Sequence, residues 1–258
     1  MCPLLGVVHL LACPSRGSTD VDAILAAAER DARVYADGGF DGLVIENFGD
    51  APFHKGDRQD PVPPDVVAVL ALAARTVKAA TGLPVAINCL RNDVHAAVGV
   101  AAATGARWVR ANVFAGAAVT DQGVIEGEAA RVLAYRRQLG SDVAILADLM
   151  VKHATPLAPR DPLAEAHDLA ARSGAAGLIV TGDRTGAAVD PELLRRVKAA
   201  VGTFPVWIGS GLAEANAATL WPLCDGAIVG TAAKRDGRTS APVDPDRVRR
   251  LRASCPPR

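Results

Sequence analysis

The stretch PVWIGSGLAEANAATLWPLCDGAIVGT, residues 205–231, contains one complete strand–helix unit and the start of the next. The short apolar run 205–209 predicts a buried strand, the alanine-rich stretch 213–220 predicts a helix, and 226–229 predicts a second strand. A strand, a helix and another strand in succession are typical of a parallel sheet, because parallel strands need a crossover connection.

The same alternation extends over the whole chain. Apolar runs that predict six further strands lie at 4–9, 42–46, 84–88, 107–112, 143–148 and 177–181. Stretches that predict the other helices lie at 20–37, 64–80, 92–104, 122–139, 162–173, 190–201 and 244–252. Eight such units predict an α/β fold, a (β/α)8 TIM barrel in which residues 1–258 form a single domain. A doubly wound sheet is the alternative, but the turn after the first predicted strand lacks the glycine-rich phosphate fingerprint of that fold.

Composition and charge exclude several classes of protein. Lys plus Arg and Asp plus Glu number 28 each, so the chain has no general attraction to nucleic acid or anionic lipid. The five cysteines form no C-x-x-C pair, which is typical of a reducing compartment rather than of a zinc site. No apolar run is long enough to cross a membrane. We therefore expect a cytoplasmic protein without stable membrane insertion, and the sequence is compatible with a homo-oligomer.

Polar residues end five of the predicted strands. Side chains i and i+2 of a strand share a face, so Arg110 and Asn112 lie on the same face of the strand at 107–112. The same test pairs an apolar residue with a polar one on four more strands: Val7 with His9, Val44 with Glu46, Ala86 with Asn88, and Leu146 with Asp148. The polar member comes last each time. We therefore expect apolar residues inside the barrel and polar residues at its C-terminal mouth, where barrel enzymes have their active sites.

Four residues near the predicted mouth are candidates for catalysis: Glu46, Asp148, Lys152 and Arg110. Glu46 and Asp148 end the second and fifth strands, so we expect them to face each other across the mouth, one as base and one as acid. Lys152 would neutralise developing negative charge, with Arg110 as the electrostatic partner. A Schiff base on Lys152 is less favoured because this lysine lies in a predicted loop. The alternative for all four residues is a ring of salt bridges that only closes the barrel top.

Other polar residues at the strand ends are candidates for substrate binding: His9, Asn47, Asn88, Arg91, Asp93, Asn112, His153 and Thr181. A capping role at the start of the next helix is the alternative for Asp93, and a hydrogen-bonded core histidine is the alternative for His9. Thr120 or Asp121 is expected to cap the helix predicted at 122–139. The long loop before residue 64 is either a lid over the site or an ordinary surface loop.

Glycine-rich turns after the last three predicted strands indicate a phosphate site. The candidate residues are Gly182, Gly209, Ser210, Gly211, Gly230, Thr231 and Lys234. Barrels often bind phosphate with the loops after strands 7 and 8, where glycine lets backbone N–H groups approach the anion. Glycine also serves tight turns without any ligand. No cofactor is predicted, although Glu46, Asp93 and Asp148 are carboxylates of the kind that could hold a divalent metal.

Taken together, these motifs resemble the BtpA/SgcQ family almost from end to end. The matching segments are GVVHL (6–10), ENFGDAPF (46–53), LRND (90–93), TDQG (120–123), ADLMVKHA (147–154), TG (181–182), IGSG (208–211) and DGAIVGTAAK (225–234). The resemblance implies a TIM barrel similar in outline to phosphate-binding barrels. The family takes its name from a factor needed for photosystem I accumulation in cyanobacteria, and other members are described as nucleosidases. The sequence departs from the family pattern at two places: the segment 13–17 stands in place of Pro-Gly-Ser-Pro, and Phe114 stands where relatives often have histidine. Both departures bear on the identity of the substrate more than on the fold.

The residues and the resemblance together predict an enzyme. We expect acid–base chemistry on a small phosphorylated sugar or nucleoside-like substrate, of the nucleosidase, isomerase or lyase type. The alternative is a non-catalytic assembly factor for a membrane complex of the photosystem I type, as the family name implies. A polar barrel mouth favours the enzyme, whereas a large apolar patch on the outer helices would favour the assembly factor.

Overall fold

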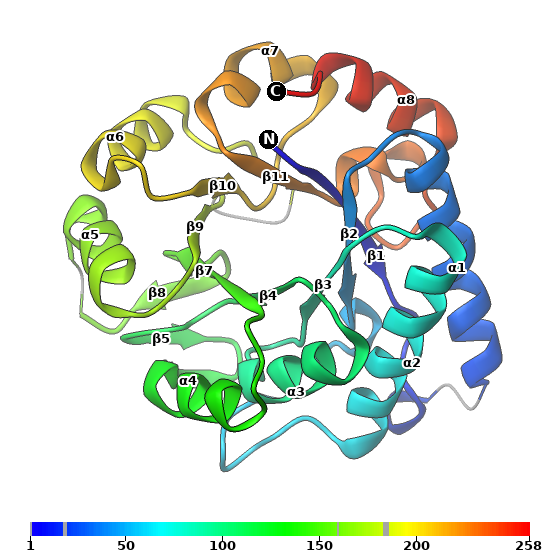
Figure 1. Cartoon of the computed structure of the whole chain (residues 1–258), viewed down its shortest axis with the longest axis horizontal. Coiled ribbons are helices and arrows are strands. Elements are labelled where there is room, and N and C mark those ends of the chain that lie inside the picture. Colours follow the sequence, from blue (N-terminus) through cyan, green and yellow to red (C-terminus); the bar gives the residue numbers. More distant parts are fainter. Residues whose placement is uncertain (1, 18–19, 159, 183–185) are drawn as a thin grey trace.

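Eight parallel strands close into a barrel (Figure 1). The computed structural model describes residues 2–17, 20–158, 160–182 and 186–258. The barrel strands are β1 (Leu4–His9), β2 (Gly42–Glu46), β3 (Val85–Asn88), β4 (Trp108–Ala111), β7 (Ala144–Leu149), β9 (Gly177–Val180), β10 (Val206–Ile208) and β11 (Gly226–Val229). Each strand pairs with the next in this order, and β11 pairs with β1. The predicted TIM barrel is therefore confirmed.

Helices surround the barrel and cover the outer face of its strands (Figure 1). They are α1 (Val21–Asp37), α2 (Pro64–Thr81), α3 (Val94–Thr104), α4 (Ala129–Gln138), α5 (Pro162–Arg172), α6 (Pro191–Val201), α7 (Glu214–Leu220) and α8 (Pro245–Ser254). Five of them follow an aspartate whose carboxylate accepts a hydrogen bond from a backbone N–H of the first turn: Asp20, Asp93, Asp161, Asp190 and Asp244. Such caps satisfy amide groups that have no partner inside the helix. No helix in the described ranges is long and apolar enough to cross a membrane.

The strands are buried on both faces, as the sequence pattern predicts. One apolar cluster fills the barrel interior: Leu5, Val7, Val44, Ala86, Trp108, Leu146, Ile179, Trp207 and Ile228. Trp108 and Trp207 meet edge to face, with their ring centroids 6.0 Å apart. The alternate residues, such as Ile45 and Ile87, belong to the larger cluster that also contains residues of the surrounding helices. A polar residue that lies two positions after one of these interior residues shares its face of the strand, so it lies at the C-terminal end of the barrel.

A three-stranded antiparallel sheet lies beside the barrel and corrects one prediction. Its strands are β5 (Ala117–Thr120), β6 (Gly123–Glu126) and β8 (Ala154–Pro156), with β5 in the centre. The prediction of a helix from residue 122 is thus wrong for 122–128, since α4 begins only at Ala129. The physical reason is local: Gly123 has a φ of +90°, which closes a hairpin. The Thr120 hydroxyl bonds to Gly123 and Gln122 within this turn, so neither Thr120 nor Asp121 caps a helix.

The loop before α2 is held by its own hydrogen bonds. His54 Nδ1 lies 2.6 Å from Asp60 Oδ1, and the backbone N–H of Lys55 donates to the other oxygen of that carboxylate at 2.8 Å. The loop also contacts the end of β3, where the Arg91 N–H donates to the His54 carbonyl. It does not line the cavity at the barrel mouth, so among the described residues it acts as a packed surface loop.

Candidate functional site

A small cavity lies at the C-terminal end of the barrel, among the predicted polar residues. Its volume is about 220 Å³. Nine of the residues named from the sequence line it: His9, Glu46, Arg110, Lys152, Gly209, Ser210, Gly211, Gly230 and Thr231. They come from β1, β2 and β4 and from the loops after β7, β10 and β11. We call it the mouth cavity.

Glu46 stands between two polar neighbours in the register of the sheet. His9, Glu46 and Asn88 are directly paired residues of the adjacent strands β1, β2 and β3. The Asn88 amide donates to Glu46 Oε2 at 2.6 Å, and His9 Nε2 lies 3.8 Å from Oε1. One carboxylate oxygen is therefore held by a hydrogen bond, while the other has only the distant imidazole as a neighbour among the described polar side chains. This oxygen is the best placed to exchange a proton with a ligand.

His9 is held in its neutral form. Burial lowers the pKa of His9 to about 3, and the charges of Lys234 and Lys152 contribute to that shift. The ring packs edge-on against Phe48, with centroids 4.8 Å apart. Its Nδ1 is buried and has no hydrogen-bond partner in the described part of the chain. A neutral imidazole with one free nitrogen can donate to or accept from a ligand without adding charge.

Arg110 and Asp148 form a buried, bidentate ion pair. Arg110 Nε and Nη2 donate to the two oxygens of Asp148, each at 2.9 Å, and the Asn112 amide donates to Oδ2 at 3.0 Å. Burial by itself would lower the pKa of Arg110, but the carboxylate of Asp148 outweighs burial and raises it. Asp148 does not line the mouth cavity, whereas Arg110 does. The structure thus does not place Glu46 and Asp148 around one cavity as expected; Asp148 orients Arg110 instead.

Lys152 brings an amine to the mouth cavity from the loop after β7. Burial lowers the pKa of Lys152, Arg110 lowers it further, and the carboxylates of Glu46 and Asp148 oppose the shift. Arg91 fixes this loop, because its Nη2 donates to the Lys152 carbonyl at 2.8 Å. A lysine whose pKa is lowered by burial releases its proton more readily than a lysine in water.

The glycines after β10 and β11 are required by close packing. A Cβ on Gly209 would lie 2.2 Å from a methyl of Ile179 and 3.2 Å from Arg110 Nη2. One on Gly230 would lie 2.9 Å from the His9 ring, and one on Gly211, which has a φ of +76°, would lie 1.9 Å from the Ala187 carbonyl. Backbone rather than side chain therefore borders the mouth cavity on this side, which is the arrangement that anion sites use.

Some of the predicted phosphate-binding and substrate-binding residues lie elsewhere. Lys234 is buried, and its Nζ donates to Asp31 of α1 at 2.9 Å, so it does not line the mouth cavity. Gly182 packs against the carbonyls of residues 187 and 188. Asp93 caps α3 and also accepts from the Val62 N–H, which is the capping alternative left open by the sequence.

Three more candidates have structural partners or lie at the edge of the site. The Asn47 side chain bonds to the backbone N–H and carbonyl of Leu90 and to Asp50, which joins the loops after β2 and β3. The Thr181 hydroxyl is buried beyond β9 and has no partner among the described residues. His153 follows Lys152 and has a lowered pKa, caused first by burial and then by the charge of Lys152.

Metal binding has no preformed cluster in the described ranges. Nowhere within them do three or more His, Cys, Asp or Glu side chains gather in a way that could hold a metal ion. The three carboxylates named from the sequence are separated: Glu46 lines the mouth cavity, Asp148 pairs with Arg110, and Asp93 caps α3.

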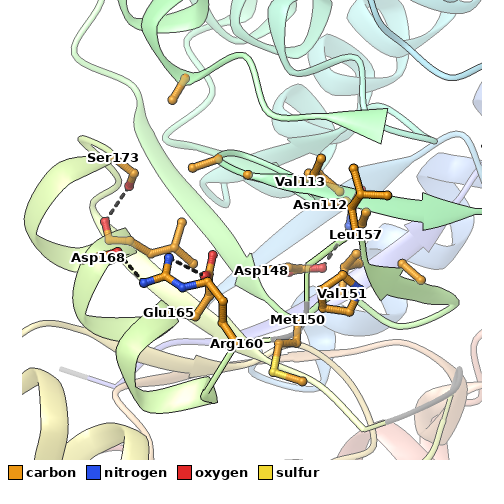
Figure 2. A pocket seen from close by; sticks show the side chains of 18 of the residues that line it. Asn112, Val113, Asp148, Met150, Val151, Leu157, Arg160, Glu165, Asp168 and Ser173 are labelled. Atoms are coloured by element: carbon orange, nitrogen blue, oxygen red, sulfur yellow. Dashed lines mark hydrogen bonds and ion pairs between the residues drawn. The ribbon is translucent and has the colours of Figure 1, made fainter. Parts of the chain in front are cut away.

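A second and larger cavity, of about 790 Å³, lies between the three-stranded sheet, α4 and α5 (Figure 2). Asn112 and Asp148 belong to its lining, together with residues of β5, β8, α4 and α5. We call it the side cavity. Sequence reasoning missed it because residues 122–128 were predicted as helix, and because charged residues on α5 are ordinary for a solvated helix face.

Comparisons with known proteins place this chain among relatives. The model of the BtpA family matches residues 1–255. A photosystem I biogenesis protein BtpA from Synechocystis sp. is 43% identical over 248 residues, which cover 95% of this chain and 85% of that relative. An uncharacterised protein from Pyrococcus furiosus is 41% identical over 251 residues, which cover 96% of this chain and 93% of that relative.

Solved structures with a similar fold are TIM-barrel enzymes. N-(5'-phosphoribosyl)anthranilate isomerase from Pyrococcus furiosus superimposes with a TM-score of 0.60 at 11% identity, covering 99% of this chain and 98% of the other. Thiamine phosphate pyrophosphorylase from the same organism gives a TM-score of 0.57 at 16% identity, with 98% and 95% covered. At such low identity these similarities show the fold alone.

Proposed function

This chain belongs to the BtpA family, and from that premise and the geometry of the mouth cavity we propose that it is an enzyme. The substrate is a small phosphorylated sugar or nucleoside-like molecule, and the reaction uses acid–base chemistry of the nucleosidase, isomerase or lyase type. Glu46 exchanges the proton with the substrate, Lys152 supplies a proton or neutralises negative charge, and Arg110 stabilises the anionic transition state.

One observation carries the proposal: buried polar atoms without partners surround the mouth of the barrel. Two belong to residues that line the mouth cavity, His9 Nδ1 and Ser210 Oγ, and two to residues at the neighbouring strand ends, Asn88 Oδ1 and Thr181 Oγ1; each has no hydrogen-bond partner in the described ranges. An unsatisfied buried group costs about 1–3 kcal/mol. Native proteins rarely leave several such groups together unless a ligand or water completes them. A molecule that carries several hydroxyl groups offers the donors and acceptors that these atoms lack.

The glycine turns supply the second half of the argument. Gly209, Gly211 and Gly230 border the same cavity as Arg110 and Lys152. Backbone N–H groups and the amine of Lys152 beside one small space favour an anion over a neutral group. Arg110 also borders this space, although Asp148 already compensates its charge. A cavity of about 220 Å³ is smaller than most ligand pockets, which favours a compact sugar phosphate over a larger ligand.

Binding of ribose 5-phosphate, measured by thermal shift and calorimetry, tests the proposal. A ligand at a hundred times its Kd stabilises a fold by about 2.7 kcal/mol, which corresponds to roughly 5–11 °C in a chain of this size. We expect this shift with ribose 5-phosphate and a much smaller one with ribose. Lys152→Met should weaken binding at least tenfold, whereas Lys78→Met, whose amine bonds to backbone carbonyls after α3, should not. Equal responses to ribose and ribose 5-phosphate would contradict an anion site.

Assembly of a membrane complex is the second candidate, favoured by the name of the Synechocystis relative. Exposed apolar side chains at Val119, Val124, Met150 and Leu157 lie in or next to the three-stranded sheet, where a partner protein could bind. Sedimentation with membranes separates the two candidates. The enzyme is expected in the supernatant without detergent, whereas persistent pelleting with membranes at high salt favours the assembly factor.

A further inference from the structure

We propose that the side cavity is a second ligand site, which binds a small, neutral, largely apolar molecule that has one hydrogen-bond donor. This inference goes beyond the proposed function and does not depend on it. It rests on the walls of the side cavity, on the pairing of its charges, and on one buried acceptor that has no partner.

The walls of the side cavity are mostly apolar and come from separate parts of the chain. Their apolar residues include Val113, Ala118, Leu133, Val151, Leu157 and Leu169. They lie in or beside β5, β8, α4 and α5, so the cavity exists only because the hairpin folds back toward β8. A volume of about 790 Å³ lies within the range of cavities that enclose organic ligands.

Charges at the rim of the side cavity compensate one another. Arg160 donates to Glu165 at 3.2 Å and to Asp168 at 2.8 Å, as the dashed lines of Figure 2 show. Arg172 also lines the cavity and acts electrostatically on Asp168, so two arginines balance these two carboxylates. The carboxylate of Asp148 is paired with Arg110. Transfer of a charged ligand into such an apolar space is unfavourable without an opposite charge left over for it. The charge pattern therefore favours a neutral molecule, in contrast to the mouth cavity.

Asn112 supplies the polar anchor. It lines the side cavity, and its Nδ2 donates to Asp148. Its Oδ1 is buried and has no partner among the described residues. An N–H or O–H donor on a ligand that reaches this oxygen would supply the hydrogen bond that it lacks.

The position of Asn112 connects the two cavities. The same Asp148 carboxylate that accepts from Asn112 holds Arg110, which lines the mouth cavity. A ligand bonded to Asn112 is therefore separated from the mouth cavity only by the ion pair of Asp148 with Arg110. The second ligand would therefore be held close to the arginine that borders the mouth cavity.

A pair of matched probes tests the site. The first is 2-naphthol, an apolar bicycle with one O–H donor, and the second is 2-methoxynaphthalene, in which a methyl group replaces that hydrogen. We expect calorimetry and ligand-observed NMR to show saturable binding of 2-naphthol to the full chain, at least fivefold tighter than binding of 2-methoxynaphthalene. Inorganic phosphate, which is directed to the mouth cavity, should not displace 2-naphthol. Displacement by phosphate, or no saturable binding of 2-naphthol, would overturn the proposal.

Two alanine-to-tryptophan variants locate the bound probe. Ala130 is an exposed residue of α4 that lines the side cavity, so Ala130→Trp fills the cavity from a solvated helix surface. Ala26 is an exposed alanine of α1 away from it, and Ala26→Trp is the matched control. Ala130→Trp should reduce 2-naphthol binding at least tenfold, and Ala26→Trp should leave it unchanged. Equal binding by both variants would place the probe elsewhere. A rise in apparent mass of the wild type that only Ala130→Trp abolishes would instead indicate a second copy of the chain as the occupant.

Discussion

Neutralising Asp148 should destabilise the barrel severely, because its partner Arg110 is buried. Both oxygens of Asp148 accept from Arg110 at 2.9 Å, and the side chain of Asp148 has no exposed surface. In Asp148→Asn the shape is retained, but the charge of Arg110 loses its compensation. Removing one partner of a buried ion pair typically costs about 3–5 kcal/mol. For a chain of this length that is a fall in Tm of roughly 6–20 °C.

The assay is chemical denaturation of Asp148→Asn and wild type, followed by circular dichroism. The control is Asp168→Asn, which removes a carboxylate from the exposed pair with Arg160 and should leave the midpoint unchanged. The double variant Arg110→Met/Asp148→Leu should recover much of the lost stability, because it leaves no unpaired charge. If Asp148→Asn unfolds at the same denaturant concentration as Asp168→Asn, the reasoning from the buried ion pair is refuted.

Three further predictions concern Lys234, His9 and Gly211. Lys234→Met leaves the buried Asp31 with Arg30, 3.2 Å away and half-exposed, as its remaining cation. The free energy of unfolding should therefore fall by at most about 3–5 kcal/mol, without a change in phosphate affinity; a tenfold loss of that affinity in calorimetry would return Lys234 to the anion site. The pKa of His9 is lowered to about 3 in the fold, so the unfolded chain binds the extra proton first as pH falls. As the pH falls from 6.5 to about 3, wild type should therefore lose stability relative to His9→Asn, by at most about 1.4 kcal/mol per pH unit. If the free energies of unfolding of the two proteins change in parallel over that range, the buried neutral imidazole is contradicted. Gly211→Ala places a Cβ 1.9 Å from the Ala187 carbonyl and should weaken phosphate binding at least tenfold. Gly202→Ala has a similar positive φ but nothing within 4 Å of the added Cβ, so it should not weaken phosphate binding. Titration of both variants with phosphate distinguishes a distorted anion loop from backbone strain alone.

Most of the barrel could be predicted because each strand carries its own signal. Buried parallel strands are short apolar runs, and interior residues such as Val44 and Leu146 are followed two positions later by Glu46 and Asp148. This spacing follows from backbone geometry alone, so it can be recognised in the sequence without knowledge of tertiary contacts. The glycine turns after β10 and β11 could be identified because the residue type itself marks them, whereas the contacts that require Gly209 and Gly230, with Ile179 and His9, are visible only in the structure.

The partners of the charged residues could not be predicted, because they depend on which side chains meet in space. The sequence places Asp148 at the mouth, but only the structure shows that Arg110 occupies both of its oxygens. Lys234 ends a glycine-rich segment that resembles a phosphate loop, yet it pairs with Asp31, 203 positions away in the chain. The hairpin at 117–126 was missed because its two short strands carry little apolar signal and are completed by β8.

The three-stranded sheet has a consequence for how this protein can be redesigned. The segments after β4 and β7 are joined by the pairing of Val119 with Thr155 and of Thr120 with Ala154. In most barrels each loop at the mouth can be exchanged separately, which is how one scaffold supports many chemistries. Here a graft that replaces only one of these two segments would leave the edge of its partner unpaired and displace Lys152, which lies two residues before β8. Residues 112–128 and 150–158 therefore form one exchangeable module, and a chimera should inherit both segments from the same parent.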